Sequence, residues 1–186
     1  AIILTLIIIS GEIDLSIASM IALTAVIFGT AYNAGLGMPI SMLIALFSGI
    51  LCGLFNGILV TQLQIPSIIL TIGTLTLYRG IAQSLASDFS LGGYPSWFIG
   101  IDYRYIGIVP IPVIIFTVFA IVVGFFLSST VYGKQLYLIG TNPQTAKYSG
   151  IKVDRIKLLL FTFSGLVCGI AGVLTTSRLA VARFNM

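Results

Sequence analysis

Residues 140–157 read GTNPQTAKYSGIKVDRIK and form the longest polar and basic stretch of an otherwise apolar chain. Within it, Asn142 is a favoured residue for capping a helix N-terminus, Pro143 suits the first helical position, and Gly150 suits the left-handed residue just past a helix end. The stretch therefore predicts a helix of about two turns over residues 143–149.

One face of this predicted helix carries small residues. Ala146 and Gly150 lie four positions apart and so fall on the same side, where another protein's surface can approach closely, whereas Lys147 points elsewhere. We interpret the helix as a docking surface. The simpler alternative is that any connector between membrane helices needs polar residues and turn formers.

Composition indicates a membrane protein. Hydrophobic residues make up 58% of the sequence and charged residues 8%, and the mean hydropathy is +1.15, values far outside the range of soluble domains. Apolar runs of about 18 residues or more can cross a bilayer as helices. We therefore predict an all-α, polytopic membrane helix bundle of about six hydrophobic segments, some of them broken or re-entrant.

The same composition argues against several functions. The sequence has no His and only five acidic residues, which leaves little for metal binding or acid–base catalysis. The net charge of +4 comes from cations beside membrane segments, so it indicates orientation rather than binding to nucleic acid. We expect no catalytic residue, no metal and no cofactor bound by this chain.

The apolar runs follow one another with short interruptions. The first, residues 1–9, has no Met, basic flank or cleavage site, and it resembles the end of a helix that begins earlier. The chain also ends just after a membrane segment, so we expect a piece of one longer membrane domain. The later runs are predicted over residues 17–32, 40–62, 67–85, 111–129 and 158–176.

A polar break follows the first run. Residues 10–16 read SGEIDLS and place Glu12 and Asp14 among apolar residues. Ionised groups at membrane depth usually face a bundle interior or a water-filled cavity, and broken helices often line a solute path. The alternative is an aqueous turn in which Asp14 and Ser16 cap the next helix, and for Glu12 we favour this alternative.

Two of the predicted helices carry stripes of glycine, a pattern that lets membrane helices pack backbone to backbone. Asn56 lies beside the first stripe, where it can hydrogen-bond across a helix contact or, as a weaker alternative, face a solute. We predict close helix packing at Gly49, Gly53, Gly57, Gly165 and Gly169.

Hydroxyl side chains follow on the next predicted helix. Thr71 and Thr74 share one face. Hydroxyls so placed can line a path for a solute rich in hydroxyls, although Thr in membrane helices also bonds to its own preceding carbonyls. With the polar residues above, the predicted translocation path comprises Asp14, Ser16, Asn56, Thr71 and Thr74.

Basic residues predict the orientation. Residues 130–157 hold five of the nine Lys and Arg residues and one Asp, which places this segment in the cytoplasm. Counting backwards, the aromatic-rich residues 86–110 lie outside if each apolar run crosses once. Arg178 and Arg183 then fall on the outer side, which hints at a last helix that stops short or turns back.

Several motifs occur together and in order along the chain. They are GEIDLSIAS at residues 11–19, GLFNG at 53–57, IPS at 65–67, TIGT at 71–74, YRG at 78–80, GTNPQTA at 140–146 and GI at 150–151. Taken together they closely resemble the permease subunits of ribose-type bacterial ABC sugar importers. Full-length relatives have further helices on both sides, so the resemblance implies an internal fragment, residues 1–186, of one ABC transporter transmembrane (permease) domain, truncated at both ends.

The resemblance implies an importer of the bacterial inner (plasma) membrane. Two permease subunits, identical or sisters, would form a central path, two cytoplasmic ATPase subunits would bind ATP and Mg, and an extracytoplasmic binding protein would deliver the sugar. Pentoses, deoxyhexoses such as rhamnose, and the sugar-like autoinducer-2 are the implied solutes. This chain would itself hydrolyse nothing.

The polar stretch looks like this family's ATPase-coupling loop. The usual core of that loop is Glu-Ala-Ala, three residues, then Gly, whereas here it reads Gln144-Thr145-Ala146 and then Gly150. The departures remove one charge and some helix propensity, both tolerable near a helix start. The resemblance thus assigns coupling to Gly140, Asn142, Pro143, Gln144, Ala146 and Gly150.

Three other functions stay open. Permeases for branched-chain amino acids have a similar coupling loop, but they tend to carry an Asn-Phe-Ala-like segment where this chain has GEIDLS at residues 11–16. An ion-coupled secondary transporter needs no ATPase and so does not explain the capped helix. A membrane scaffold explains the glycine stripes but not the interrupted first helix.

Overall fold

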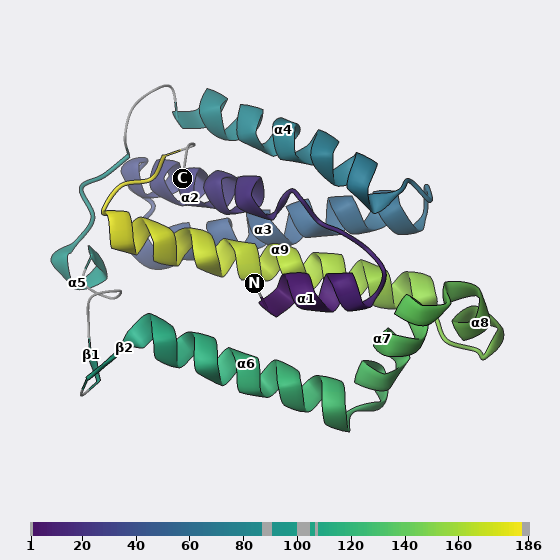
Figure 1. The fold of residues 1–186 in the computed structure, drawn as a ribbon. Coiled ribbons are helices and arrows are strands. Elements are labelled where there is room, and N and C mark those ends of the chain that lie inside the picture. The colour runs from purple at the N-terminus through teal and green to yellow at the C-terminus, as the bar shows by residue number, and fades with distance from the viewer. Residues whose placement is uncertain (1, 87–90, 100–104, 107, 184–186) are drawn as a thin grey trace.

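A computed structural model describes residues 2–86, 91–99, 105–106 and 108–183 of the chain (Figure 1). The described part is almost entirely helical. In chain order its elements are α1 (Ile2–Ile9), α2 (Ile17–Asn33), α3 (Met38–Thr61), α4 (Ser67–Ala86), α5 (Ser96–Ile99), β1 (Tyr105–Ile106), β2 (Val109–Pro110), α6 (Ile111–Ser129), α7 (Val131–Thr141), α8 (Pro143–Tyr148) and α9 (Val153–Leu179).

Four helices among the described residues, namely α3, α4, α6 and α9, are long and apolar enough to cross a membrane, and α2 is a shorter apolar helix. Together with α1 they account for the six hydrophobic segments that the sequence predicts. The break after the first segment is also present, because the chain between α1 and α2 is not helical. The predicted all-α polytopic membrane bundle is confirmed.

Helix bounds agree best where the sequence itself marks the ends. The run predicted at residues 111–129 coincides with α6, where Pro110 precedes the helix and Thr130 is extended. By contrast, α9 extends beyond the predicted residues 158–176 at both ends. It begins earlier because its polar first turn resembles the connector in sequence. Helix α7 was not predicted at all, although its buried residues Gly133, Leu136 and Ile139 recur every three positions.

The centre of the bundle is the antiparallel pair α3 and α9, and α2 packs against both. The backbones of the pair touch, because a Cβ on Gly49 would lie 2.3 Å from the carbonyl oxygen of Gly165, and a Cβ on Gly165 would lie 2.1 Å from that of Gly49. A Cβ on Gly53 would meet the carbonyl oxygen of Phe161 at 2.2 Å. The two predicted glycine stripes therefore face each other.

The bundle has two ends with different contents (Figure 1). At one end, which we call the α8 end, lie α7, α8 and the α3–α4 turn at residues 62–66. At the other, the α5 end, lie the α2–α3 turn, α5, the β1–β2 hairpin and the end of α9. Each long helix runs once between these ends. The last helix therefore neither stops short nor turns back, contrary to the expectation drawn from Arg178 and Arg183.

The α5 end is held by aromatic packing. Phe28 on α2 stacks on Tyr94 with ring centroids 5.5 Å apart and packs on Phe98 of α5 at 5.3 Å. The hydroxyl of Ser177 on α9 donates a hydrogen bond to the carbonyl oxygen of Phe98. The hairpin pairs only two residues on each strand and is antiparallel. These contacts anchor the long α4–α6 connection to the bundle.

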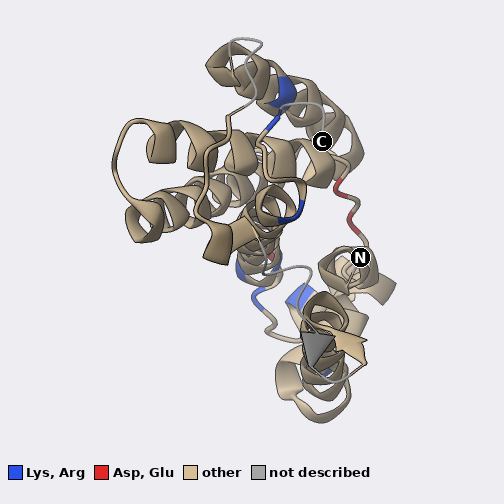
Figure 2. Ribbon diagram, turned by 90° about the vertical axis from the view of Figure 1, so that its left-hand side faces the viewer, with Lys and Arg blue, Asp and Glu red and all other residues tan. Residues whose placement is uncertain are grey.

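Charged residues are sparse on the ribbon when the molecule is viewed along the bundle (Figure 2). Helix α6 carries no charged residue, and of its residues only Val123 is buried inside the described chain. Its outer surface is therefore suited to lipid or to another membrane helix.

Candidate functional site: a capped helix and a buried polar cluster

Helix α8 begins where the sequence predicts. The side-chain oxygen Oδ1 of Asn142 accepts hydrogen bonds from the backbone N–H groups of Gln144 and Thr145, each 3.0 Å long. These bonds satisfy two donors that a helix start would otherwise leave free. The helix ends at Tyr148, one residue before the predicted end, and Gly150 follows with φ of +83°, a left-handed conformation that favours glycine.

The docking face of α8 differs from the predicted one. Ala146 is only 3% exposed, because it packs inside the chain against Ile139 of α7 and Val153 of α9. The prediction that Ala146 and Gly150 jointly meet another protein is therefore wrong for Ala146. Its small size lets α8 fit onto its own neighbours, and the outward face of α8 carries Gln144, Lys147 and Tyr148, of which Tyr148 is 90% exposed.

Gly140 and Gly150 are glycines for different reasons. A Cβ on Gly150 would meet nothing within 4 Å, so only its backbone angle calls for glycine. A Cβ on Gly140 would lie 1.8 Å from the carbonyl oxygen of Ile9, so the end of α7 sits directly on the end of α1. Both glycines shape the region around α8 rather than present a side chain.

A second group of functional candidates meets inside the bundle, and we call Asp14, Ser16, Asn56 and Tyr78 the polar cluster. Oδ1 of Asp14 accepts hydrogen bonds from the N–H of Ser16 at 2.9 Å and from its hydroxyl at 2.6 Å. Nδ2 of Asn56 donates to the same hydroxyl at 2.9 Å. The Tyr78 hydroxyl lies 2.9 Å from Oδ1 of Asn56 and 3.0 Å from the carbonyl oxygen of Cys52, so one proton serves two acceptors.

Thr71 and Thr74 lie beside this cluster but bond mainly to backbone. The Thr71 hydroxyl donates to the carbonyl oxygen of Ser67 at 2.7 Å and has a longer contact of 3.3 Å with that of Ile13. In the part of the chain that the structure describes, the Thr74 hydroxyl donates only to the carbonyl oxygen of Thr71, at 3.5 Å. Both threonines are buried where α4 packs on the rest of the chain. The predicted path residues therefore lie in one region. The hydroxyls of these two threonines bond to backbone carbonyls, as the alternative interpretation expected.

The aqueous-turn alternative for Asp14 is wrong. Asp14 is 3% exposed and Ser16 is fully buried, and the Ser16 side chain makes no capping bond to α2. Oδ2 of Asp14 has no hydrogen-bond partner among the described residues. A buried carboxylate oxygen without a partner is costly, which marks the cluster as a place where water or a polar solute is favoured.

Glu12 does not stand in an aqueous turn either. Its carboxylate pairs with the ammonium of Lys157 on α9 at 2.5 Å, and both side chains are largely shielded from solvent. The pair borders a cavity of about 300 Å³ at the α8 end, which is lined by polar and charged side chains of α8, α9 and the α3–α4 turn, including Gln64, Gln144 and Lys147.

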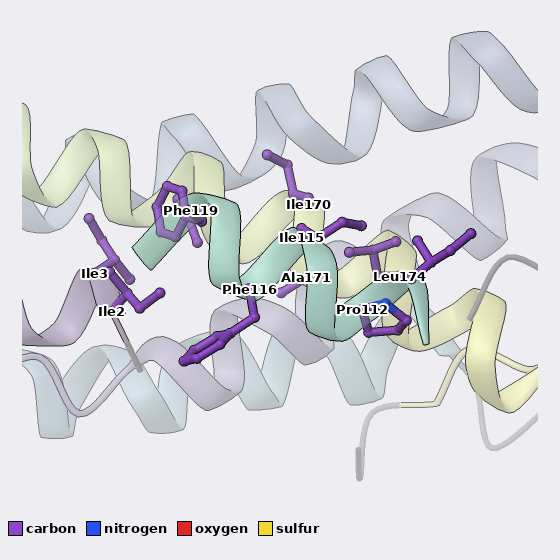
Figure 3. A pocket seen from close by; sticks show the side chains of 11 residues that line it. Ile2, Ile3, Pro112, Ile115, Phe116, Phe119, Ile170, Ala171 and Leu174 are labelled. Atoms are coloured by element: carbon purple, nitrogen blue, oxygen red, sulfur yellow. The ribbon is translucent and has the colours of Figure 1, made fainter. Parts of the chain in front are cut away.

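The larger apolar cavities are unsuited to a sugar. One of about 310 Å³ lies between α1, α6 and α9, and its labelled side chains, such as Phe119, Ile115 and Ile170, carry no polar atom that could bind a hydroxyl (Figure 3). Another of about 470 Å³ lies between α6, α7 and α9 and is also almost entirely apolar, with the Tyr132 side chain on its wall. Such cavities fit acyl chains or neighbouring apolar helices.

Sequence reasoning missed two residues of the site. Tyr78 follows Thr71 and Thr74 at helical spacing, so the shared face of α4 was a signal that could have found it. Lys157 had no comparable signal, because its partner Glu12 lies 145 positions away.

Comparison with known proteins places the chain in a family. Residues 1–186 match the family described as the branched-chain amino acid transport system permease component. The autoinducer 2 import system permease protein LsrD of Escherichia coli (strain K12) is 35% identical over 191 residues, which cover 98% of this chain and 57% of LsrD, and LsrD of Shigella flexneri gives the same values.

The chain thus spans 57% of the length of these curated relatives. No solved structure matches it. Its apolar helices and these relatives make it a multi-pass protein of the inner (plasma) membrane. Since the family match covers every residue, the chain belongs to the family of branched-chain amino acid transport system permease components.

Proposed function

We propose that this chain is part of the permease subunit of an ATP-driven ABC importer that moves a sugar or sugar-like solute across the inner membrane. The observation that carries the proposal is α8, a short helix with both ends stabilised, seated on α7 and α9 with its polar face outward at the basic end of the bundle. A rigid element so placed can dock in a groove of a cytoplasmic partner and transmit that partner's movement.

The partner of α8 would be one of two ATPase subunits, which bind ATP and Mg, so this chain itself would need no cofactor. The outward face of α8 supplies Gln144, Lys147 and Tyr148 for that contact. Asn142 and Gly150 would act indirectly, by stabilising the start of the helix and by turning the chain away after its end. Pro143 begins the helix and Gly140 seats α7 against α1.

The solute would be sugar-like. The family description names branched-chain amino acids, whereas the relatives at 35% identity are permeases for autoinducer 2. We give the relatives more weight because residues 11–16 carry the polar segment that resembles that of the sugar importers. Pentoses and deoxyhexoses such as rhamnose belong to the same proposed class.

The polar cluster is the proposed neighbour of the translocation path. It combines a carboxylate, two hydroxyls and an amide within hydrogen-bonding distance of one another, and Asp14 keeps one oxygen without a partner among the described residues. These are the groups that bind sugar hydroxyls. A second permease subunit, identical or sister, would complete the path, and an extracytoplasmic binding protein would deliver the solute.

Uptake into vesicles tests this function. The vesicles should hold the full-length permease, its ATPase and its binding protein, and the solutes should include labelled pentoses, rhamnose, autoinducer 2 and branched-chain amino acids. We expect uptake of one sugar-like solute that stops without ATP. Uptake of amino acids alone would contradict the proposed solute class. Uptake that survives ATP depletion and collapses with an uncoupler would instead indicate an ion-coupled transporter.

A further inference from the structure

The Glu12–Lys157 ion pair joins the break after α1 to helix α9. Neither residue belongs to α8 or to the polar cluster, so the role of the pair is a separate question. Its charged atoms lie 2.5 Å apart, and the two side chains expose only 14% and 13% of their surfaces. A second ion pair among the described residues at this end, Lys147–Asp154, spans 3.5 Å and leaves 66% and 59% of its side chains exposed. An exposed pair contributes little to stability, so only the shielded pair holds its elements firmly.

A gain in stability does not explain why a shielded ion pair is present. Moving two charges out of water costs about as much free energy as their attraction returns, and apolar replacements of such pairs are often equally stable. What the pair does provide is register, because either charge left alone in the interior is strongly unfavourable. The pair therefore ties the position of Glu12 to the position of Lys157.

On one side, the pair is tied to α8. Ala146 packs against Val153 in the first turn of α9, and the N–H of Ile151 donates to the carbonyl oxygen of Ala146 at 3.1 Å. Lys157 lies four residues after Val153, about one turn further along the same helix. A displacement of α8 that carries the start of α9 with it also displaces Lys157.

On the other side, the pair leads to the polar cluster through a short non-helical segment. Ile13, next to Glu12, donates its N–H to the hydroxyl of Ser67 on α4 at 3.1 Å. Asp14 follows and is joined through Ser16 to Asn56 on α3. A displacement of Glu12 therefore acts on hydrogen bonds to both α3 and α4.

We propose that Glu12 and Lys157 are positioning residues that pass movement of the α8 helix to the polar cluster, so that solute movement follows ATP hydrolysis. The inference rests on the proposed function as an ATP-driven permease. It assigns the pair to coupling, not to solute binding or to ATPase docking, since neither side chain belongs to the polar cluster or to the outward face of α8.

The test measures two rates in the same vesicles, with the full-length permease, its ATPase and its binding protein. The quantity compared is the number of solute molecules taken up per ATP hydrolysed. For Glu12→Gln and for Lys157→Met we expect this ratio to fall at least tenfold, while recovery of the ATPase with the permease stays normal. The double variant Glu12→Lys with Lys157→Glu should restore at least half of the wild-type ratio.

Lys134→Met is the matched control, because Lys134 is an exposed lysine on α7 at the same end and its loss changes the net charge as Lys157→Met does. Its ratio should equal that of the wild type. Single variants of the pair that transport as efficiently as the wild type would overturn the inference. The inference would also be overturned if the swapped pair took up no more solute per ATP than the single variants do. Loss of ATPase binding in Glu12→Gln would overturn it as well, because either result would show that the pair is merely structural.

Wild-type vesicles separate the two hypotheses. If the wild-type permease shows no ATP-driven uptake of any solute, the proposed function fails, and this inference fails with it. If wild-type uptake is present and the pair variants behave as the wild type, only the inference about Glu12 and Lys157 fails.

Discussion

The side-chain amide of Asn56 on α3 donates a hydrogen bond of 2.9 Å to the hydroxyl of Ser16, which lies 40 positions earlier in the chain. The Asn56 oxygen in turn receives the hydroxyl of Tyr78 on α4 at 2.9 Å. One amide therefore holds together the break after α1 and two membrane helices. All three side chains are buried, and the geometry of the cluster depends on Asn56.

Replacing Asn56 with Leu should destabilise the permease by about 1 kcal/mol. Hydrogen bonds between membrane helices average roughly 0.6 kcal/mol, and a buried partner left unpaired adds to the loss. Thermal unfolding of the purified permease in detergent measures the change. Ser48→Ala is the control, because within the described residues the Ser48 hydroxyl bonds only to the carbonyl oxygen of Ala45 in its own helix, at 2.8 Å. An equal effect of both substitutions would contradict a linking role for Asn56.

Replacing Gly165 with Ala should destabilise the permease by about 1–3 kcal/mol or more, because the added methyl group cannot fit between α3 and α9 without moving a backbone. The same unfolding measurement applies. Gly124→Ala on α6 is the control, since a Cβ there meets nothing within 4 Å, and Ala in a helix is favoured over Gly by about 0.5–1 kcal/mol. Equal melting temperatures for the two variants would show that α3 and α9 do not touch at Gly165.

Replacing Asn142 with Ala should weaken recovery of the ATPase with the permease several-fold. The change removes the two bonds that cap α8, a loss of about 1 kcal/mol in helix stability. Asn142→Asp keeps a capping oxygen and places negative charge at a helix start, so it should retain recovery. Affinity purification of the complex from membranes compares the variants. Loss of the ATPase with Asp as with Ala would mean that Asn142 itself touches the partner.

Substitutions at Gly150 separate backbone conformation from contact. Val is poorly suited to the observed φ of +83°, whereas Asn adopts left-handed angles more readily than other residues. We expect Gly150→Val to lower recovery of the ATPase and Gly150→Asn to keep most of it, measured by the same purification. Equal losses with both side chains would indicate that the ATPase packs directly on Gly150 and that its small size matters most.

Cysteine labelling tests the proposed path. In a full-length permease whose Cys52 and Cys168 are replaced, Asn56→Cys and Thr74→Cys should react with small aqueous thiol reagents in at least one state of the ATP cycle. Labelling should be slow without nucleotide, because both positions are buried in this structure. Thr117→Cys on the apolar helix α6 should stay unlabelled throughout. Positions 56 and 74 that never react would remove them from the path.

Much of the architecture could be predicted because it depends on properties of short segments. Helix α6 is bounded by Pro110 and an extended Thr130, so its ends follow from local chemistry. The same is true of the start of α8 at Asn142. Helix α7 was missed because it is only 11 residues long and begins two residues after α6 ends. Its helical period is clearest once Leu136 and Ile139 are seen to be buried.

The site was predicted only in part, for a related reason. Asp14, Ser16 and Asn56 were singled out as polar residues in apolar surroundings, a property of the sequence alone. That they form one network with Tyr78 depends on how α3 and α4 approach the break after α1. Likewise, Ala146 is buried because α7 and α9 cover the face of α8 on which it lies. The sequence suggested that this face was exposed.

By itself, the sequence determined the membrane class, the number of apolar segments and the capped helix, because hydropathy and helix capping act over a few neighbouring residues. Only the tertiary structure decided which face of α8 is exposed, that Asp14 is buried rather than in an aqueous turn, and that Glu12 pairs with Lys157. Those outcomes depend on contacts between residues far apart in the chain, such as the 145 positions between Glu12 and Lys157, and such contacts form only when the helices pack.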